Sequence, residues 1–125
     1  MDTAKILVVD DDIVMLKVIE KQLADSGFRV VTAIGGREAL QALEGFFPDL
    51  IITDILMPLT SGLELIGIVR SMHGNSTPPI LVLSALDEED TVLEAFNLGA
   101  EDFLTKPIKP GELSLRVKKL LRKTK

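Results

Sequence analysis

Three aspartates, Asp10, Asp11 and Asp12, stand side by side directly after the apolar run "ILVV". Neighbouring carboxylates repel one another, so a cluster of this kind next to a buried segment requires compensating cations. Two further charged residues follow apolar runs elsewhere in the chain, Asp54 after "LIIT" and Lys106 after "DFLT". Mg²⁺ prefers oxygen ligands from a few carboxylates and often shares its site with phosphate. If these side chains meet, one Mg²⁺ and one lysine would balance the carboxylates of Asp10, Asp11 and Asp54.

The elements that must position these residues follow a regular pattern. Five apolar runs, rich in β-branched residues, recur at 5–9, 29–33, 49–53, 79–84 and 102–105. Five segments of helical pattern alternate with them, at 12–26, 35–46, 62–72, 87–99 and 110–123. Strands that alternate with helices predict a parallel sheet with helices on both faces. The 125 residues therefore predict one domain, 1–125, with an α/β, doubly wound five-stranded parallel sheet.

The first helical segment has an expected inward face and an expected cap. The face consists of Val14, Leu16, Val18, Ile19 and Leu23. Asp12 precedes this segment, and aspartate is a preferred residue at the amino-terminal cap of a helix. We therefore expect Asp12 to cap the helix rather than to join the site.

Ligands of doubly wound sheets bind beyond the carboxyl ends of the strands, where the strand order switches. Asp10, Asp54, Ser84 and Lys106 all stand at the ends of predicted strands, and only the second strand lacks a comparable group. Each residue has an ordinary explanation when taken singly, as a helix cap, a turn residue, a buried hydroxyl or a solvated lysine. These explanations do not account for a common edge. The pattern therefore favours a site there.

Composition excludes several other classes. There is no cysteine, and the single histidine, His73, lies in the polar stretch "SMHGNSTPP", so we expect it in a solvated loop. The net charge of −5 argues against direct nucleic-acid binding. No apolar run is long enough to span a bilayer, and no secretion signal is visible at the amino terminus. We expect a cytoplasmic protein that does not associate with membranes.

Four motifs carry a resemblance to a known family: "ILVVDDD", "DLIITDILMP" with Gly62, "ILVLSA" and "FLTKP". In this order and spacing they resemble the response-regulator receiver domain, the phosphorylatable partner of sensor histidine kinases. The resemblance covers essentially the whole chain. It implies a flavodoxin-like (βα)5 three-layer sandwich with strand order 2-1-3-4-5. It also implies a phosphoacceptor signalling domain of a two-component phosphorelay.

The resemblance assigns a phosphoryl acceptor and a metal site. Asp54 matches the aspartate that accepts the phosphoryl group in a Mg²⁺-dependent reaction. Asp11 matches a direct Mg²⁺ ligand, and Asp10 matches an acid that acts through water. Leu56 matches the position whose backbone carbonyl completes the metal site.

The resemblance also assigns a switch. Lys106 matches the lysine that pairs with the phosphoryl group, and Ser84 matches the switch Ser/Thr that binds it. Phe103 matches the switch aromatic, although it lacks the hydroxyl of the tyrosine frequent in the family. Ser61 stands where the family often has aspartate before the glycine at 62, and we expect little chemical effect.

The resemblance extends to partners. The phosphodonor would be a sensor histidine kinase or phosphotransfer protein. Complementary charges on the last elements suggest homodimerisation through the face formed by the fourth helix, fifth strand and fifth helix. The acidic set is Glu88, Glu89, Asp90, Glu101 and Asp102, and the basic set is Arg116, Lys118, Lys119, Arg122 and Lys123. An output domain beyond Lys125 is a further expectation.

The chain is not expected to be an enzyme beyond self-catalysed transfer to Asp54 and slow autodephosphorylation. Leu56 and Leu86, which flank the phosphoryl position by analogy, are apolar and cannot orient an attacking water. The main alternative is a haloacid-dehalogenase-like phosphatase, in which "DDDIV" supplies Asp10 as nucleophile. That family needs further acidic ligands after its lysine, and here only Glu112 follows Lys106. A flavodoxin-like electron carrier would need a phosphate-binding loop after the first strand, where this chain has acidic residues instead. A docking module that works without phosphorylation remains an open alternative.

Overall fold

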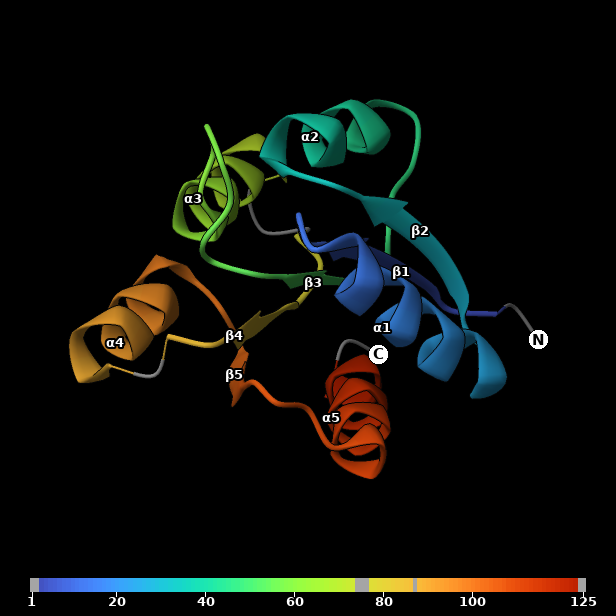
Figure 1. Cartoon of the computed structure of the whole chain (residues 1–125). Coiled ribbons are helices and arrows are strands. Elements are labelled where there is room, and N and C mark those ends of the chain that lie inside the picture. Colours follow the sequence, from blue (N-terminus) through green and yellow to red (C-terminus); the bar gives the residue numbers. More distant parts are fainter. Residues whose placement is uncertain (1–2, 74–76, 87, 124–125) are drawn as a thin grey trace.

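The computed structural model describes residues 3–73, 77–86 and 88–123, and in it five strands alternate with five helices (Figure 1). The strands are β1 (Lys5–Val9), β2 (Arg29–Ala33), β3 (Leu50–Thr53), β4 (Ile80–Ser84) and β5 (Asp102–Thr105). The helices are α1 (Ile13–Asp25), α2 (Gly36–Glu44), α3 (Gly62–His73), α4 (Glu89–Leu98) and α5 (Pro110–Lys123). All ten predicted elements are present, with ends that differ by one or two residues.

The strands form one parallel sheet in the order β2-β1-β3-β4-β5, as predicted. The chain therefore crosses over after β2, and β1 lies between β2 and β3. In the β1–β3 pair Val9 stands opposite Thr53, so the residues that follow these two strands leave the sheet side by side. This register brings the Asp10 and Asp54 positions together at the strand-order switch.

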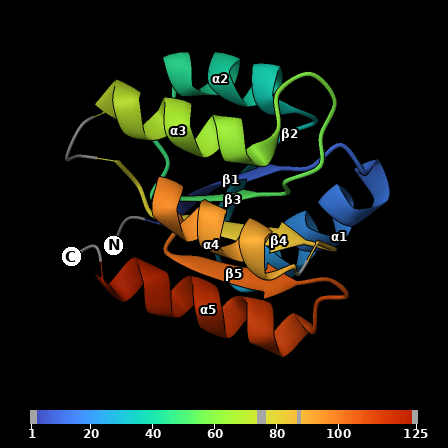
Figure 2. The same ribbon diagram turned by 90° about the vertical axis from the view of Figure 1, so that its left-hand side faces the viewer.

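Helices cover both faces of the sheet, which gives three layers (Figure 2). Alternate residues of each strand point to opposite faces. Leu7, Val9, Ile51 and Val82 pack with buried residues of α2, α3 and α4. Ile6, Val8, Ile52 and Leu81 pack with buried residues of α1 and α5. The apolar strands are thus buried on both sides, as parallel sheets require.

Helix α1 begins as predicted, but two of its expected core residues were assigned wrongly. The Asp12 carboxylate accepts hydrogen bonds from the backbone N–H groups of Val14 and Met15, so Asp12 is the cap. Leu16, Ile19 and Leu23 are buried, whereas the side chains of Val14 and Val18 are 73% and 45% exposed. With 3.6 residues per turn, the two valines lie on the side of the helix opposite the buried stripe. The exposed valines leave an apolar strip on the outer side of α1.

Arg70 ties the carboxyl end of α4 to its surroundings. Its guanidinium donates hydrogen bonds to Thr77 Oγ1, to the backbone oxygens of Pro78 and Gly99, and to Glu101 Oε1. Gly99 ends α4 in the left-handed conformation (φ 118°), as expected for a helix stop. A side chain there would also collide with Arg70, because a Cβ on Gly99 would lie 2.7 Å from the arginine Nε. This junction joins α3, β4, α4 and β5.

Three smaller predictions have mixed outcomes. His73, expected in a loop, is the last residue of α3. Asp87, expected to begin the fourth helix, lies outside the described residues, and α4 begins at Glu89. In the part of the chain that the structure describes, none of the helices has both the length and the apolar character needed to cross a bilayer.

Candidate functional site

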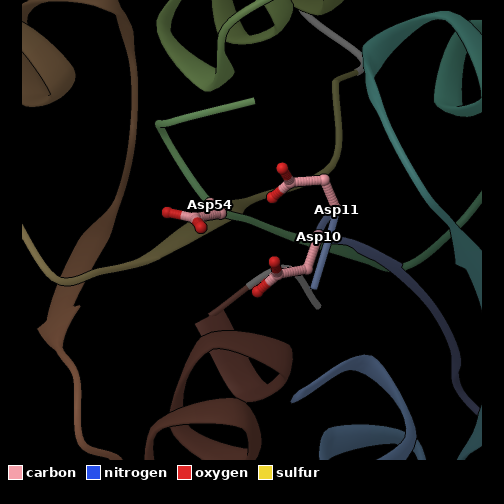
Figure 3. Close-up of side chains that lie close together, drawn as sticks. All are labelled: Asp10, Asp11 and Asp54. Carbon is pink, nitrogen blue, oxygen red and sulfur yellow. The ribbon is translucent and has the colours of Figure 1, made fainter. Parts of the chain in front are cut away.

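Three carboxylates meet beyond the ends of β1 and β3, as the sequence predicted (Figure 3). Asp10 and Asp11 follow β1, and Asp54 follows β3. One oxygen from each lies within 4.8 Å of the others. Residues that are 44 positions apart in the chain, Asp10 and Asp54, are therefore neighbours in the folded protein.

Asp10 is buried and has partners on both of its carboxylate oxygens. Its side chain is 2% exposed. Oδ1 accepts a hydrogen bond from the backbone N–H of Asp12 at 2.9 Å, and Oδ2 lies 2.8 Å from Lys106 Nζ. A buried carboxylate is tolerated only when it is paired and hydrogen-bonded. These two contacts give each carboxylate oxygen of Asp10 a partner in the interior.

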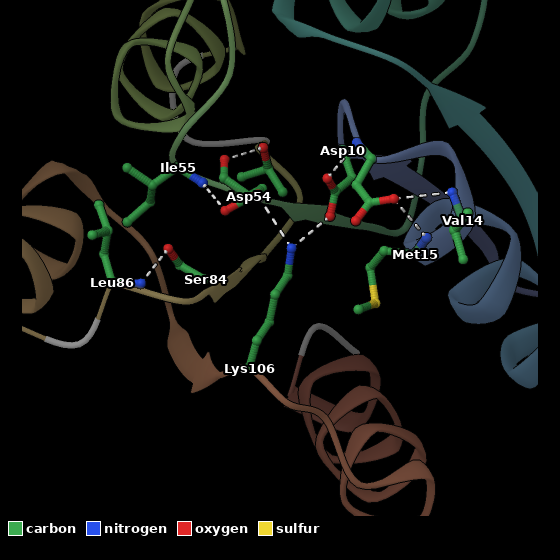
Figure 4. Close-up of polar contacts among 10 residues, drawn as sticks. Asp10, Val14, Met15, Asp54, Ile55, Ser84, Leu86 and Lys106 are labelled. Carbon is green, nitrogen blue, oxygen red and sulfur yellow. Dashed lines mark hydrogen bonds and ion pairs between the residues drawn. The ribbon is translucent and has the colours of Figure 1, made fainter.

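Asp54, whose side chain is 11% exposed, is fixed in a similar way by a contact on each carboxylate oxygen (Figure 4). Its Oδ1 accepts a hydrogen bond from the backbone N–H of Ile55 at 2.6 Å. Its Oδ2 lies 3.2 Å from Lys106 Nζ. Its backbone N–H donates to the carbonyl oxygen of Val9 at 3.1 Å, which continues the β1–β3 ladder by one residue. The position of the carboxylate is thus set by the sheet, and its orientation by the next peptide.

Lys106 is the cation of the site. It follows β5, and its ammonium bridges the Asp10 and Asp54 carboxylates with a side chain that is 15% exposed. Burial acts to lower the pKa of this ammonium, but the hydrogen bond to Asp10 and the charges of Asp54 and Asp10 outweigh it. The pKa of Lys106 is therefore raised above its ordinary value of 10.5. The side chain is positively charged at all physiological pH values.

The charges of the site suit a divalent cation. Three carboxylates and one ammonium leave two negative charges uncompensated, and Asp11 is exposed at the opening. Hard oxygen ligands and two uncompensated charges fit Mg²⁺ better than a softer metal. Asp10, Asp11 and Asp54 could therefore hold the ion. The metal-ligand role of the Leu56 carbonyl stays a prediction.

Ser84 and Phe103 lie on the same face of the sheet. Val82 pairs with Phe103 in the β4–β5 ladder, and Ser84 is two residues beyond Val82, so all three side chains point toward the α4 side. Ser84 is 1% exposed, and its Oγ accepts a hydrogen bond from the Leu86 N–H at 3.1 Å. Phe103 is half-buried and packs against the core. The placement agrees with a switch pair, although the switching role itself stays a prediction.

The segment that follows Asp54 contains Leu59, whose conformation the sequence did not indicate, and leads to Gly62, the motif glycine, for which the structure supplies a reason. A Cβ on Gly62 would lie 1.9 Å from the carbonyl oxygen of Asp54, so no larger residue fits at position 62 without moving the backbone of Asp54. Leu59 has a positive φ of 72° and a side chain that is 94% exposed. Leucine disfavours this conformation because of its Cβ, and an exposed side chain gains nothing from burial.

The sequence patterns did not indicate a role for Thr53 either. It is the last residue of β3 and is completely buried. Its hydroxyl donates to the carbonyl oxygen of Asp54 at 2.9 Å. A threonine at the end of an apolar run is so ordinary in a strand that its type alone carried no signal.

The charged face of α4, β5 and α5 is less free than expected. Arg116 contacts Asp102 of the same chain at 2.8 Å, and Arg70 contacts Glu101 at 2.7 Å. The first contact raises the pKa of the Arg116 guanidinium. Three residues of the predicted charged sets, Glu101, Asp102 and Arg116, are thus paired within the chain. Glu88, Glu89, Asp90, Lys118, Lys119 and Arg122 are exposed, and the side chain of Lys123 lies outside the description.

Comparison with known proteins identifies relatives over nearly the whole chain. The family model described as the response regulator receiver domain matches residues 6–118. The alkaline phosphatase synthesis transcriptional regulatory protein PhoP of Bacillus subtilis is 41% identical over 120 residues, which cover 96% of this chain and 49% of PhoP. The transcriptional regulatory protein PrrA of Mycobacterium tuberculosis is 41% identical over 127 residues, which cover 98% of this chain and 54% of PrrA. The chain thus spans about half the length of these curated relatives.

Solved structures have the same fold. The receiver domain of the Francisella response regulator 1452 superposes with a TM-score of 0.90 at 35% identity, covering 98% of this chain and 100% of that chain. The chemotaxis protein CheY4 of Vibrio cholerae gives a TM-score of 0.90 at 34% identity, covering 95% of this chain and 99% of that chain.

Proposed function

The chain belongs to the response regulator receiver domain family of two-component signalling, and we propose from this premise that Asp54 is its phosphoryl acceptor. The donor would be a sensor histidine kinase or phosphotransfer protein. One observation carries the proposal: the Asp54 carboxylate is oriented by the Ile55 N–H and lies beside the Lys106 ammonium and two further carboxylates. Asp10 is the more deeply buried of the two acids that contact Lys106, with a side chain that is 2% exposed against 11% for Asp54.

The proposed reaction is an in-line displacement. A carboxylate oxygen of Asp54 attacks the phosphorus of a phosphohistidine, an O–P bond forms, and the P–N bond breaks with its electron pair going to the imidazole. Phosphoryl transfer depends mainly on positioning and charge neutralisation. A Mg²⁺ bound by Asp10, Asp11 and Asp54, with the Leu56 carbonyl, would supply positive charge to the phosphoryl oxygens.

Two side chains would complete this neutralisation. The Lys106 ammonium, which already lies 3.2 Å from Asp54 Oδ2, can contact a phosphoryl oxygen added there. The Ser84 Oγ accepts a hydrogen bond from the Leu86 N–H, so its own hydrogen can be donated to another phosphoryl oxygen. Movement of Ser84 toward the phosphoryl group would vacate space on the face that Phe103 shares, and this would change the α4-β5-α5 surface.

Mass spectrometry tests the acceptor directly. After treatment with acetyl phosphate and Mg²⁺, the wild-type chain should gain one labile phosphoryl group, and Asp54→Asn should not. Asp25→Asn, which alters an exposed aspartate far from the site in the sequence, is the matched control and should be labelled like the wild type. An unchanged adduct in Asp54→Asn would refute the assignment.

The same experiment separates the alternatives. A haloacid-dehalogenase-like phosphatase would carry the phosphoryl group on Asp10, and a pure docking module would carry none. The phosphatase alternative is not favoured, because the family match covers 6–118 and is that of the receiver domain. We also propose slow autodephosphorylation, since Leu56 and Leu86 offer no group to orient water; a phosphoryl half-life of seconds would contradict this.

The exposed strip of α1 supports a docking surface for the phosphodonor. The strip consists of Val14 and Val18, which are 73% and 45% exposed, and the neighbouring Ile13 is 58% exposed. This apolar surface begins directly after the acidic cluster. Val14→Glu should therefore slow transfer from a histidine kinase and leave phosphorylation by acetyl phosphate unchanged. Equal loss with both donors would mean that the substitution disturbs the site instead.

The relatives PhoP and PrrA are transcriptional regulators about twice as long as this chain, which supports a proposed output domain beyond Lys125.

The exposed apolar side chains Leu93, Phe96 and Leu115 and the exposed charges of α4 and α5 support homodimerisation through the α4-β5-α5 face on phosphorylation. Sedimentation in the presence of beryllofluoride should detect a dimer, and Leu115→Glu should prevent it. A wild-type chain that is monomeric both with and without beryllofluoride would count against dimerisation.

A further inference from the structure

Thr53 is a buried polar residue that the proposed reaction leaves without a role. Among the described residues, four polar or charged side chains are buried: Asp10, Thr53, Asp54 and Ser84. The other three belong to the site. Thr53 is completely buried, directly precedes Asp54 and donates its hydroxyl hydrogen to the Asp54 carbonyl oxygen at 2.9 Å.

That carbonyl belongs to the peptide that also holds the Asp54 carboxylate. The peptide between Asp54 and Ile55 is planar, so its C=O and its N–H turn together. The N–H donates to Asp54 Oδ1 at 2.6 Å. Any rotation of the peptide plane therefore moves the donor that orients the carboxylate.

Two contacts hold this peptide. The Thr53 hydroxyl binds the oxygen, and the Cα of Gly62 packs so closely that a Cβ there would lie 1.9 Å from the same oxygen. Gly62 is itself fixed, because its N–H donates to the Ile55 carbonyl oxygen at 2.9 Å. Gly62 thus limits the space around the oxygen, and Thr53 supplies the directional contact.

We propose that Thr53 is a positioning residue for phosphoryl transfer: its hydroxyl fixes the Asp54–Ile55 peptide, which holds Oδ1 and leaves Oδ2 turned toward Lys106. The proposal rests on the proposed function of Asp54 as phosphoryl acceptor. Thr53 touches none of the reacting atoms. It acts on the orientation of the carboxylate, and in-line attack depends steeply on that orientation.

The test removes the hydroxyl and keeps the shape. Thr53→Val is nearly isosteric, Thr53→Ala is a second hydroxyl-free variant in case valine impairs folding, and Thr53→Ser restores the hydroxyl. Thr32→Val, at an exposed threonine of β2, is the matched control. The rate constant for phosphorylation by phosphoramidate with Mg²⁺ is followed by intact mass. The chemical shift of the Ile55 amide proton, measured by NMR without phosphodonor, reports the N–H···Oδ1 hydrogen bond.

Thr53→Val and Thr53→Ala should react about three- to tenfold more slowly, the effect of losing one neutral hydrogen bond. Their Ile55 amide proton should shift upfield, as expected for a weakened hydrogen bond. Thr53→Ser should react within about twofold of the wild-type rate and should have an Ile55 amide proton shift close to that of the wild type. Thr32→Val should change neither the rate nor the shift.

Two results would overturn the proposal: hydroxyl-free variants that match the wild type in rate and Ile55 shift, or a serine variant that is as slow as the valine variant. A wild-type chain that forms no adduct would instead refute the role of Asp54. The Ile55 shift would then still decide whether Thr53 orients the carboxylate.

Discussion

Replacing Lys106 by methionine would remove the ammonium that bridges Asp10 and Asp54 while keeping roughly the length of the side chain. The two Nζ···Oδ2 distances are 2.8 and 3.2 Å, and the side chains are 15% (Lys106), 2% (Asp10) and 11% (Asp54) exposed. In the variant, these two carboxylates and Asp11 would stand together with no positive charge. We expect a large loss of stability in metal-free protein.

The size of the loss follows from these distances. At an effective dielectric constant of about 20, the two attractions amount to roughly 6 and 5 kcal/mol. Desolvation of the ammonium offsets much of this sum, and removing one partner of a buried pair usually costs about 3–5 kcal/mol. Because Asp11 is exposed to solvent, we expect a value at the low end of this range, a decrease of about 3 kcal/mol in the free energy of unfolding.

Urea unfolding followed by circular dichroism measures this quantity, since the chain has neither tryptophan nor tyrosine as a fluorescent probe. In EDTA, Lys106→Met should unfold at a much lower urea concentration than the wild type. Mg²⁺ should then stabilise the variant more than the wild type, because the variant site has three uncompensated negative charges in place of two.

Lys21→Met provides the control. Lys21 pairs with Asp25 at 3.1 Å on the surface, where both side chains are more than half exposed, so its loss should cost about 0.5 kcal/mol or less. If Lys106→Met and Lys21→Met are equally stable in EDTA, the electrostatic reasoning about the site is wrong.

Three further changes have expected outcomes. Gly62→Ala places a Cβ 1.9 Å from the Asp54 carbonyl oxygen and should cost about 2 kcal/mol or more in urea unfolding, with slower phosphorylation; near wild-type values for both would contradict the close approach. Leu59→Gly relieves a positive φ of 72° at an exposed residue and should raise the free energy of unfolding by about 0.5–1 kcal/mol, whereas a loss would show that the leucine makes contacts that matter. Because the pKa of Lys106 is raised in the folded protein, its stabilising contribution is complete below the unfolded pKa of about 10.4 and is lost as pH rises through the folded value. The wild type should therefore lose stability more steeply than Lys106→Met above this pH, and parallel pH profiles would exclude the linkage.

The sequence predicted the arrangement of the site well because parallel strands impose it. Once five apolar runs alternate with helices, the carboxyl ends of all strands lie at one edge. The strand order, which the resemblance implied, then places Asp10 beside Asp54, and the long side chain of Lys106 reaches both from the end of β5. The distances among their side chains are consequences of that topology. Their chemical roles depended on resemblance to a family, because a carboxylate near a lysine does not by itself specify phosphoryl transfer.

Other features could not be predicted because they depend on contacts that sequence patterns do not encode. Val14 and Val18 are apolar at helical spacing, and the packing of α1 on the sheet decided that Leu16 faces inward as predicted while these two valines do not. From the sequence, Asp102 and Arg116 were expected to be available to a partner, but the packing of α5 beside β5 pairs them within the chain. The hydroxyl of Thr53 meets a backbone oxygen of its neighbour, a contact that any strand threonine could have lacked.

The Arg70 junction has a mechanical consequence for α4. The arginine anchors the carboxyl end of this helix at Gly99 and Glu101, whereas the side chain of Glu88 makes no capping hydrogen bond at the amino end. A helix held at one end behaves as a lever with its fulcrum at that end. A displacement near Ser84 would therefore move Glu89 further than Leu98, which lies about 13.5 Å away along the helix axis.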